Sequence, residues 1–344
     1  MYDGGGKKNL NLLILEVLKD YSDEEHALTQ QRVLQLLKEN YGVVCDRRSV
    51  RNNIDCLIEY GFDIDTEKGY RLMSRTFDDA ELQMLINSVV FSKFLTKAQA
   101  KQLIDKLVDE SSRHFKPRFT HLANVTTLQH TENKQAMINL DLIDEAIERK
   151  QKLSFIYNSY GTDRRMHPRR KEPYIYNPYQ IVMSNGYFYL VGNYDKYDTI
   201  SHYRIDKMTN MEILDEERKP AREVKGMEHG LDLPKHMAEH VYMFSGESVM
   251  VLLRTSQRSM DMLYDWFGKD FQIVEQYEDG MMDVRLRCNQ EAMEYWALQY
   301  GKYVTVLEPA ELREKLRTDI AEIAARYEEA RGMHTKHDAE DLQA

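Results

Sequence analysis

The chain has 344 residues, 42% of them hydrophobic and 30% charged, which is typical of a globular protein with two or three domains. No apolar run approaches the roughly 20 residues that a membrane span requires, and residues 1–8 lack the apolar core of a signal peptide. Cys45, Cys56 and Cys288 lie far apart and form no metal-binding or disulfide pattern, so a reducing cytoplasm is the expected location.

The formal net charge of −10 argues against nucleic-acid binding by the chain as a whole, because phosphate contacts require Lys and Arg. Basic residues nevertheless gather at Arg47, Arg48 and Arg51, and again in the segment 164–171. The acidic excess lies elsewhere, notably in residues 275–283. An acidic protein can still bind nucleic acid at such local basic islands.

Residues 1–75 are predicted to form one domain of three helices and a β-hairpin. Apolar residues recur at helical spacing, and Thr29 is a suitable N-cap for the second helix. Alternating segments on either side of Glu67-Lys68-Gly69 predict the hairpin. The predicted elements are 10–18, 29–40 and 47–60 for the helices, and 62–65 and 70–72 for the strands. This order is that of a winged helix-turn-helix.

The third predicted helix carries the residue types of a DNA-recognition helix. With Val50, Ile54, Leu57 and Ile58 facing the core, its basic and amide side chains point outward. Arg contacts guanine or phosphate, Asn contacts adenine and Ser contacts phosphate. The candidate DNA-binding residues, including two in the hairpin, are Arg47, Arg48, Ser49, Arg51, Asn52, Lys68 and Arg71. The alternative is a solvated helix face in an interaction domain.

The middle of the chain changes character twice. Residues 76–138 are predicted to be a helical connector with two helices before about residue 114, followed by a polar linker from 117 to 138. Residues 139–216 are predicted to begin with a helix and to continue as short strands separated by Gly, Pro and Asn. Several short strands with turn signals favour a small barrel or sandwich.

The C-terminal part is predicted to be a compact α/β unit over residues 235–331. Strand and helix patterns alternate in it, and Pro309 opens the last helix, which runs through Leu312, Leu316, Ile320 and Ile323. Residues 332–344 are predicted to be a disordered tail. Together, the whole pattern predicts an α+β chain with several domains.

The strand-rich segment combines tyrosines with basic residues. Most of its tyrosines are expected in the core, since strands favour aromatic side chains. The basic residues of 164–171 follow a Tyr160-Gly161 turn and are either a ligand site or a solvated loop. His202 and Arg204 alternate with Tyr203, so they share one face of a strand, which is expected to be the open one.

Three stretches of this region resemble the WYL domain of bacterial regulators. They are Asn177 to Val182, Tyr187-Phe188-Tyr189-Leu190-Val191-Gly192 and His202-Tyr203-Arg204-Ile205-Asp206-Lys207. Phe188 stands where the family has Trp, and Arg204, Asp206 and Lys207 are the more specific part of the match. Residues 1–75 resemble the winged helix-turn-helix of these regulators. Phe267-Gly268, Trp296 to Gly301 and Val306 to Pro309 resemble their C-terminal extension.

The resemblance implies a cytoplasmic bacterial transcription factor, usually a homodimer, with an Sm-like (SH3-like) β-barrel that senses a ligand. That ligand is expected to be a single-stranded nucleic acid or a nucleotide. Aromatic stacking and a positive groove agree with such a ligand. The effector-binding residues expected from it are Tyr157, Arg165, Tyr189, His202, Arg204 and Lys207.

The sequence therefore predicts a ligand-responsive regulator that binds double-stranded operator DNA. The alternative is an adaptor or effector-binding module whose N-terminal domain contacts proteins. No dinucleotide, P-loop, metalloprotease or nucleophile-elbow motif occurs in the sequence, so no enzymatic activity, catalytic residue, metal site or cofactor is expected. His167 beside Arg165 and Arg169 lacks the carboxylate cluster of a nuclease site.

Overall fold

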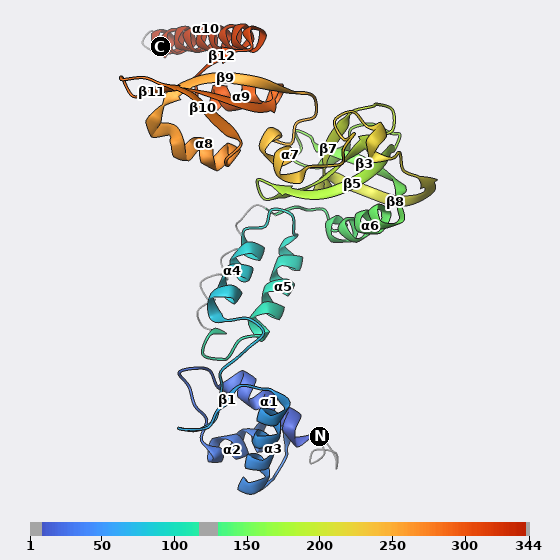
Figure 1. Ribbon diagram of the computed structural model, residues 1–344, viewed down its shortest axis with the longest axis vertical. Helices are drawn as coiled ribbons and strands as arrows, with labels where there is room; N and C mark the ends of the chain where they lie inside the picture. Colours follow the sequence, from blue (N-terminus) through green and yellow to red (C-terminus); the bar gives the residue numbers. More distant parts are fainter. Residues whose placement is uncertain (1–8, 117–129, 342–344) are drawn as a thin grey trace. The chain divides into compact units, whose positions relative to one another are not determined.

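The chain divides into two compact units, Met1–Lys134 and Gln135–Ala344, in a computed structural model that describes residues 9–116 and 130–341 (Figure 1). Helices dominate the first unit, and antiparallel sheets with flanking helices make up the second. The predicted α+β chain with several domains is confirmed at this level. None of the described helices combines the length and apolar character needed to cross a bilayer.

The first unit begins with three helices and a short hairpin: α1 (Leu10–Tyr21), α2 (Gln30–Tyr41), α3 (Arg47–Tyr60), β1 (Ile64–Asp65) and β2 (Arg71–Leu72). Thr29 and Asp46 cap α2 and α3 by accepting backbone N–H bonds, and Gly42 and Gly61, both with positive φ, follow their last residues. Leu28 exchanges two backbone hydrogen bonds with Tyr70, so the segment before α2 joins the hairpin. The local sequence thus fixes where α3 begins and ends.

Two further helices complete the first unit, α4 (Asp79–Val90) and α5 (Lys97–Asp109), which pack side by side (Figure 1). Each begins with a capping box, at Asp78 and Thr96. The segment after α5 is held against α1, since the N–H of Arg113 donates to the carbonyl of Asp20. Most of the predicted linker, residues 117–129, lies outside the described residues.

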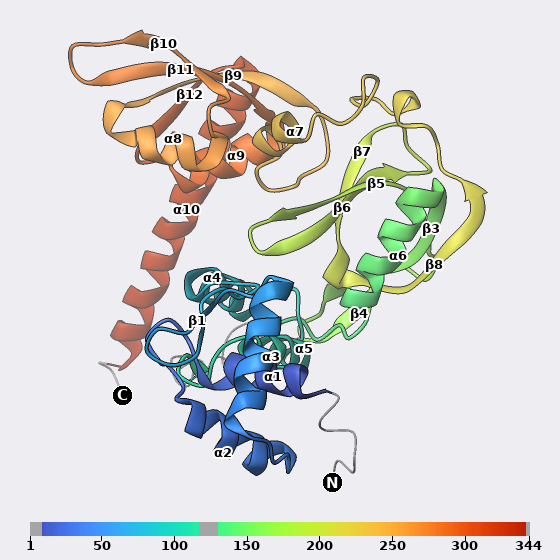
Figure 2. The same ribbon diagram turned by 60° about the horizontal axis from the view of Figure 1, so that its bottom comes forward.

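The second unit opens with α6 (Ala136–Arg149) and a curled six-stranded sheet (Figure 2). Its strands are β3 (Gln151–Tyr160), β4 (Met166–Pro168), β5 (Tyr174–Ser184), β6 (Tyr187–Tyr194), β7 (Ile200–Arg204) and β8 (Met208–Glu217). The order is β4-β3-β5-β6-β7, and β8 pairs with β3. Helix α6 packs against β3, β5 and β8. Its buried Asn139 donates to the carbonyl of Met208.

A single short turn closes the curl of this sheet. Only the 3₁₀ turn η2 (Ile205–Lys207) separates β7, which pairs with β6, from β8, which pairs with β3. Three residues span at most about 10 Å, so the ends of β7 and β8 must lie close together. Buried Phe155, Tyr176 and Leu190 fill the interior, and Tyr203 contacts the first two of them ring to ring.

Gly192 on β6 is required by this packing. A Cβ there would overlap the carbonyl oxygen of Asn177 and the ring of Tyr176, which is fully buried. We expect Gly192→Ala to lower the free energy of unfolding by about 2–3 kcal/mol, the upper range for overpacking a core. Urea unfolding followed by near-UV circular dichroism of the tyrosines measures this loss.

Gly301→Ala is the matched control for that substitution. Its nearest neighbour would be an ordinary 3.4 Å contact, with no positive φ to strain. An equal loss in both variants would show that the Gly192 contact is not the cause.

The last part of the chain forms a second sheet, of order β10-β11-β9-β12, with helices α9 and α10 packed against it. Its elements are β9 (Ser248–Ser256), α8 (Met260–Phe267), β10 (Phe271–Gln276), β11 (Met281–Asn289), α9 (Gln290–Gln299), β12 (Val304–Glu308) and α10 (Ala310–Asp341). The fully buried Trp296 lies in the core with Val251, Leu253 and Leu312. Helix α10 extends from Ala310 to Asp341.

The segment between the two sheets carries a short helix, α7 (Leu233–Glu239). This segment folds back over β7. Lys225 forms a parallel backbone β-bridge with Thr199, just before β7, and the N–H of His202 donates to the Ser245 hydroxyl at 3.3 Å. Strand β7 is therefore covered on one side by residues that follow it by some 20 to 45 positions in the sequence.

Candidate functional site

The exposed face of α3 presents basic and amide side chains opposite a buried apolar face. Val50, Ile54 and Leu57 are buried, whereas the four candidates Arg47, Arg48, Arg51 and Asn52 are exposed. Ser49 is half-buried, and its N–H is the donor to the capping Asp46 at 2.7 Å. Ile58, predicted to face the core, is 39% exposed, because it lies at the edge of the buried stripe.

The three arginines of α3 are free to bind a ligand. Within residues 9–116 and 130–341, no carboxylate forms a salt bridge with Arg47, Arg48 or Arg51 (the charge of Arg48 acts on Asp46 only as a minor influence). The backbone of Arg47, and not its guanidinium, is held, since its carbonyl accepts from Gln30 at 2.8 Å. An unpaired, exposed guanidinium is the group that phosphate and guanine recognise.

The hairpin candidates differ from each other. Lys68 is exposed at the turn between β1 and β2. Arg71 is already engaged: its guanidinium forms an ion pair with Asp65, its cross-strand partner, and donates to the carbonyl of Glu24 at 2.9 Å. The donors of Arg71 thus hold the hairpin against the segment before α2, whereas Lys68 has an exposed side chain.

On the curled six-stranded sheet, Arg204 is the centre of a polar cluster at the end of β7. Its guanidinium binds the buried Asp206 through two hydrogen bonds, of 3.0 and 2.7 Å, and stacks on the Tyr187 ring at 3.4 Å. Burial alone would lower the pKa of Arg204, but the bond to Asp206 and its charge outweigh burial and raise it. This is a well-fixed arginine with one aromatic face beside it.

Lys207 and Arg169 add positive charge next to this cluster. Burial lowers the pKa of the Lys207 ammonium, and the nearby charges of Arg204 and Arg169 lower it further, against the opposing charge of Asp206. Its ammonium group forms no salt bridge with any residue in the described ranges. A bound anion would relieve this repulsion, so the place is suited to phosphate or carboxylate.

Tyr189 and Tyr157 take different positions around the cluster. Tyr189 is half-buried near Arg204, and burial raises the pKa of its phenol. Tyr157 is only 6% exposed, its hydroxyl accepts the N–H of Arg204 at 3.3 Å, and burial raises its pKa to about 12. Tyr157 was predicted to contact the effector, but its ring is buried within the curled sheet and its hydroxyl supports β7.

The remaining basic residues of the segment 164–171 are not equivalent. Arg165 is exposed in the β3–β4 turn, where its N–H donates to Asp163 at 3.0 Å. Arg170 is held: it stacks on Tyr174 at 3.5 Å and donates to the hydroxyl of Tyr194 at 2.6 Å. We define the anion patch as Arg169, Tyr187, Tyr189, Arg204 and Lys207.

His202 does not belong to the anion patch. Strand alternation places His202 and Arg204 on one face, as predicted, but at His202 this face is covered by the α7 segment. Nε2 of His202 lies 2.8 Å from Nε2 of His236, and the ring also neighbours His240. Burial, followed by the charges of His240 and His236, holds the pKa of His202 well below its usual range. The expected open face at His202 is therefore wrong.

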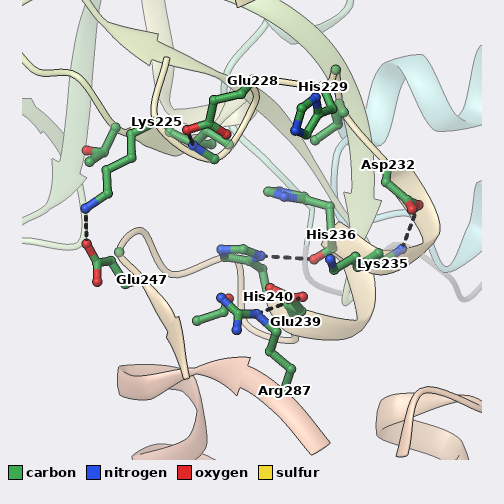
Figure 3. A pocket seen from close by; sticks show the side chains of 17 residues that line it. Lys225, Glu228, His229, Asp232, Lys235, His236, Glu239, His240, Glu247 and Arg287 are labelled. Carbon is green, nitrogen blue, oxygen red and sulfur yellow. Dashed lines mark hydrogen bonds and ion pairs between the residues drawn. The ribbon is translucent and has the colours of Figure 1, made fainter. Parts of the chain in front are cut away.

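Sequence reasoning also missed residues that the structure brings into these clusters. Tyr187 was placed in the core, although the two-residue spacing with Tyr189 puts both on one face of β6. His236 and His240, four residues apart, line a cavity with Glu239 and Arg287 (Figure 3). Their spacing was visible in the sequence, but their proximity to His202 was not.

Comparisons with known proteins identify two domains in this chain. Residues 139–213 match the WYL domain family and residues 247–324 match the WCX domain family. No curated protein matches the chain.

Two solved structures are similar to the chain. One is proteasome accessory factor B/C (PafBC) of Arthrobacter aurescens, with 14% identity, 93% of this chain and 49% of that chain covered, and a TM-score of 0.29. The other is a crystal structure of a CRISPR Cas-related protein, with 17% identity, 75% and 76% covered, and a TM-score of 0.39. The chain thus spans about half the length of PafBC. At TM-scores below 0.5, neither similarity bears on function.

Proposed function

Because the chain carries a WYL domain followed by a WCX domain, we propose that it is a transcriptional regulator that binds operator DNA and responds to an anionic, nucleotide-like effector. Residues 9–72 act as a winged helix-turn-helix, with α3 as the recognition helix and the β1–β2 hairpin as the wing. The WYL domain acts as an Sm-like sensor barrel. The proposal assigns no catalytic reaction to the chain.

The observation that carries DNA binding is the exposed face of α3. Arg47, Arg48, Arg51 and Asn52 are exposed together, and the three arginines lack salt bridges among the described residues. A recognition helix needs this combination of donors opposite a buried apolar face. Lys68 on the hairpin turn is suited to a backbone phosphate beside the groove.

Selection of binding sites from a random duplex library tests this part of the proposal. We expect one enriched motif with a pseudo-palindrome, since two copies in a homodimer would read two half-sites. An unselective pool, or one with no retained DNA, would favour the alternative in which the N-terminal domain contacts proteins. Mass measurement by light scattering tests the homodimer separately.

The effector is proposed to bind at the anion patch. Tyr187 and Tyr189 supply aromatic surface, and Lys207 supplies a cation in an unfavourable positive environment. A base stacked on an aromatic ring and a phosphate beside a cation is the general mode of single-strand recognition. A single-stranded oligonucleotide is therefore the first probe to use. Effector binding changes operator affinity only if the effector has different affinities for the DNA-competent and the DNA-incompetent arrangements of the protein.

Lys207→Ala should weaken binding of a single-stranded oligonucleotide about tenfold. The loss of one phosphate contact should also reduce the slope of log K against log salt concentration by about 0.7. Fluorescence anisotropy with labelled oligonucleotide at several salt concentrations measures both quantities. Lys302→Ala, at an exposed lysine before β12, removes the same charge outside the anion patch and should leave both unchanged. Equal effects of the two variants would contradict the assignment.

A further inference from the structure

We propose that His202, His236 and His240 form a binding site for one divalent transition-metal ion of the zinc type. The sequence predicts no metal site, because its cysteines are scattered and His202 is far from the other two histidines along the chain. The fold brings them together, since the segment that carries α7 folds back over β7.

The geometry of the three rings is that of a ligand set. One nitrogen from each ring lies within 4.8 Å of the corresponding nitrogens of the other two, and the Nε2 atoms of His202 and His236 are 2.8 Å apart. Tetrahedral zinc at 2.0–2.1 Å from each nitrogen requires ligand atoms about 3.3 Å apart. Small side-chain rotations would therefore bring the three nitrogens to this spacing. They would move the His202 and His236 nitrogens slightly apart and bring the His240 nitrogen closer to both.

The hydrogen bonds around the rings prepare them as ligands. Nδ1 of His240 donates to the carbonyl of His236 at 3.0 Å, which leaves its Nε2 lone pair for a metal. Nδ1 of His202 is buried and has no hydrogen-bond partner among the described residues. The ring of His202 therefore meets the other histidines through its Nε2 side.

The rings lie in a largely enclosed setting, since His236 is 7% exposed and His240 is 8% exposed. A neutral imidazole offers a ring nitrogen lone pair to a metal ion. Three neutral imidazoles without a thiolate favour zinc, nickel or copper over magnesium or calcium.

The site would leave one coordination position facing a cavity. His236 and His240 line a cavity of about 760 Å³, together with Glu239, Glu228 and Arg287 (Figure 3). Three histidines with an open fourth position is a known arrangement for zinc. Glu239 is largely buried beside His240 and is paired with Arg287 at 3.4 Å, so its carboxylate is near enough to influence the ion.

An ion at this place would join two parts of the second unit. His202 belongs to the WYL domain match, whereas His236 and His240 lie between the WYL and WCX matches. Binding would fix the α7 segment on β7, two residues from Arg204. A ligand that binds only the folded form stabilises it in proportion to the logarithm of its concentration.

Among the described residues, the other cluster that could hold a metal is Asp23, His26 and His114. It is more exposed, and His26 already pairs with Asp23 at 2.6 Å. It serves as the internal control for the experiment.

The experiment uses the untagged full chain, stripped of metal with a chelator and titrated with Zn²⁺ by calorimetry, with Mg²⁺ as the competitor. We expect one tightly bound zinc per chain, an increase in the thermal unfolding midpoint with zinc, and no competition by Mg²⁺. His202→Gln and His236→Gln should each weaken zinc binding at least tenfold and abolish the thermal shift. His26→Gln/His114→Gln should change neither.

Binding of Co²⁺ to the wild-type chain is a second test, and it does not depend on any variant folding correctly. Co²⁺ held by three imidazoles in a tetrahedral site gives intense visible absorption, and zinc should displace it one for one. Absence of zinc binding and of this spectrum in the wild-type chain would overturn the proposal. So would a loss of zinc binding confined to His26→Gln/His114→Gln.

Discussion

Replacing Arg48 and Arg51 together by alanine should weaken operator binding about a hundredfold. Both side chains are exposed on α3 without a salt bridge to any described residue, so their removal leaves no buried partner behind. Each arginine contact with a base or phosphate contributes about 1–3 kcal/mol. Two contacts of about 1.4 kcal/mol each, in the lower half of that range, give about 2.8 kcal/mol, or a hundredfold in Kd. Anisotropy with the selected duplex measures the loss.

The salt dependence of the same variant separates base contacts from phosphate contacts. Each phosphate contact contributes about 0.9 to the slope of log K against log salt concentration. A slope reduced by about 2 would assign both arginines to the backbone, and a reduced slope with relaxed sequence preference would assign one of them to a base. Alanine is the best helix former, so α3 itself should not be weakened.

Lys97→Ala/Lys101→Ala is the matched control. These exposed lysines lie four residues apart on α5. Their replacement removes the same charge from the first unit as the arginine double variant does. If both double variants weaken binding equally, the effect comes from net charge and α3 is not the recognition helix. If neither does, the adaptor alternative gains support.

The fold of α3 was predictable because its determinants are local. The apolar spacing, the capping Asp46 and the terminal Gly61 all lie within 16 residues, and the helix spans Arg47–Tyr60 as predicted. The pairing of Arg71 with Asp65 was less visible, since it depends on the register of the hairpin, which places them directly opposite each other. An arginine directly opposite a carboxylate in a two-residue hairpin more often pairs with that carboxylate than remains free to bind DNA.

The environment of His202 could not be predicted from its own strand. Alternation correctly gives the face on which it lies, but whether that face is open depends on a segment more than 30 residues later. No periodic pattern in residues 219–246 indicates that they return to β7. The residues missed at the sites illustrate the same difference: the position of Tyr187 follows from local alternation, while those of His236 and His240 required the tertiary fold.

Arg204 shows how one side chain can be misassigned when its partner is close in sequence. It was predicted to bind the effector, and its place in the anion patch allows contact with a ligand, but two of its donors already bind Asp206. We therefore expect Lys207 to report effector binding more cleanly than Arg204, because substitution of Arg204 also removes its bonds to the buried Asp206.

Arg204→Ala should lower the free energy of unfolding by about 3 kcal/mol, because it removes the two hydrogen bonds that the guanidinium donates to the buried Asp206 carboxylate. The Asp206 side chain is 3% exposed and that of Arg204 is 21% exposed, so solvent can compensate little at the carboxylate. Asp206→Asn should destabilise less, since an amide is cheaper to bury than an unpaired charge. The double variant Arg204→Ala/Asp206→Asn should lose less than the sum of the two single losses. Urea unfolding of the three variants measures the coupling. Additive losses would show that the two residues act separately.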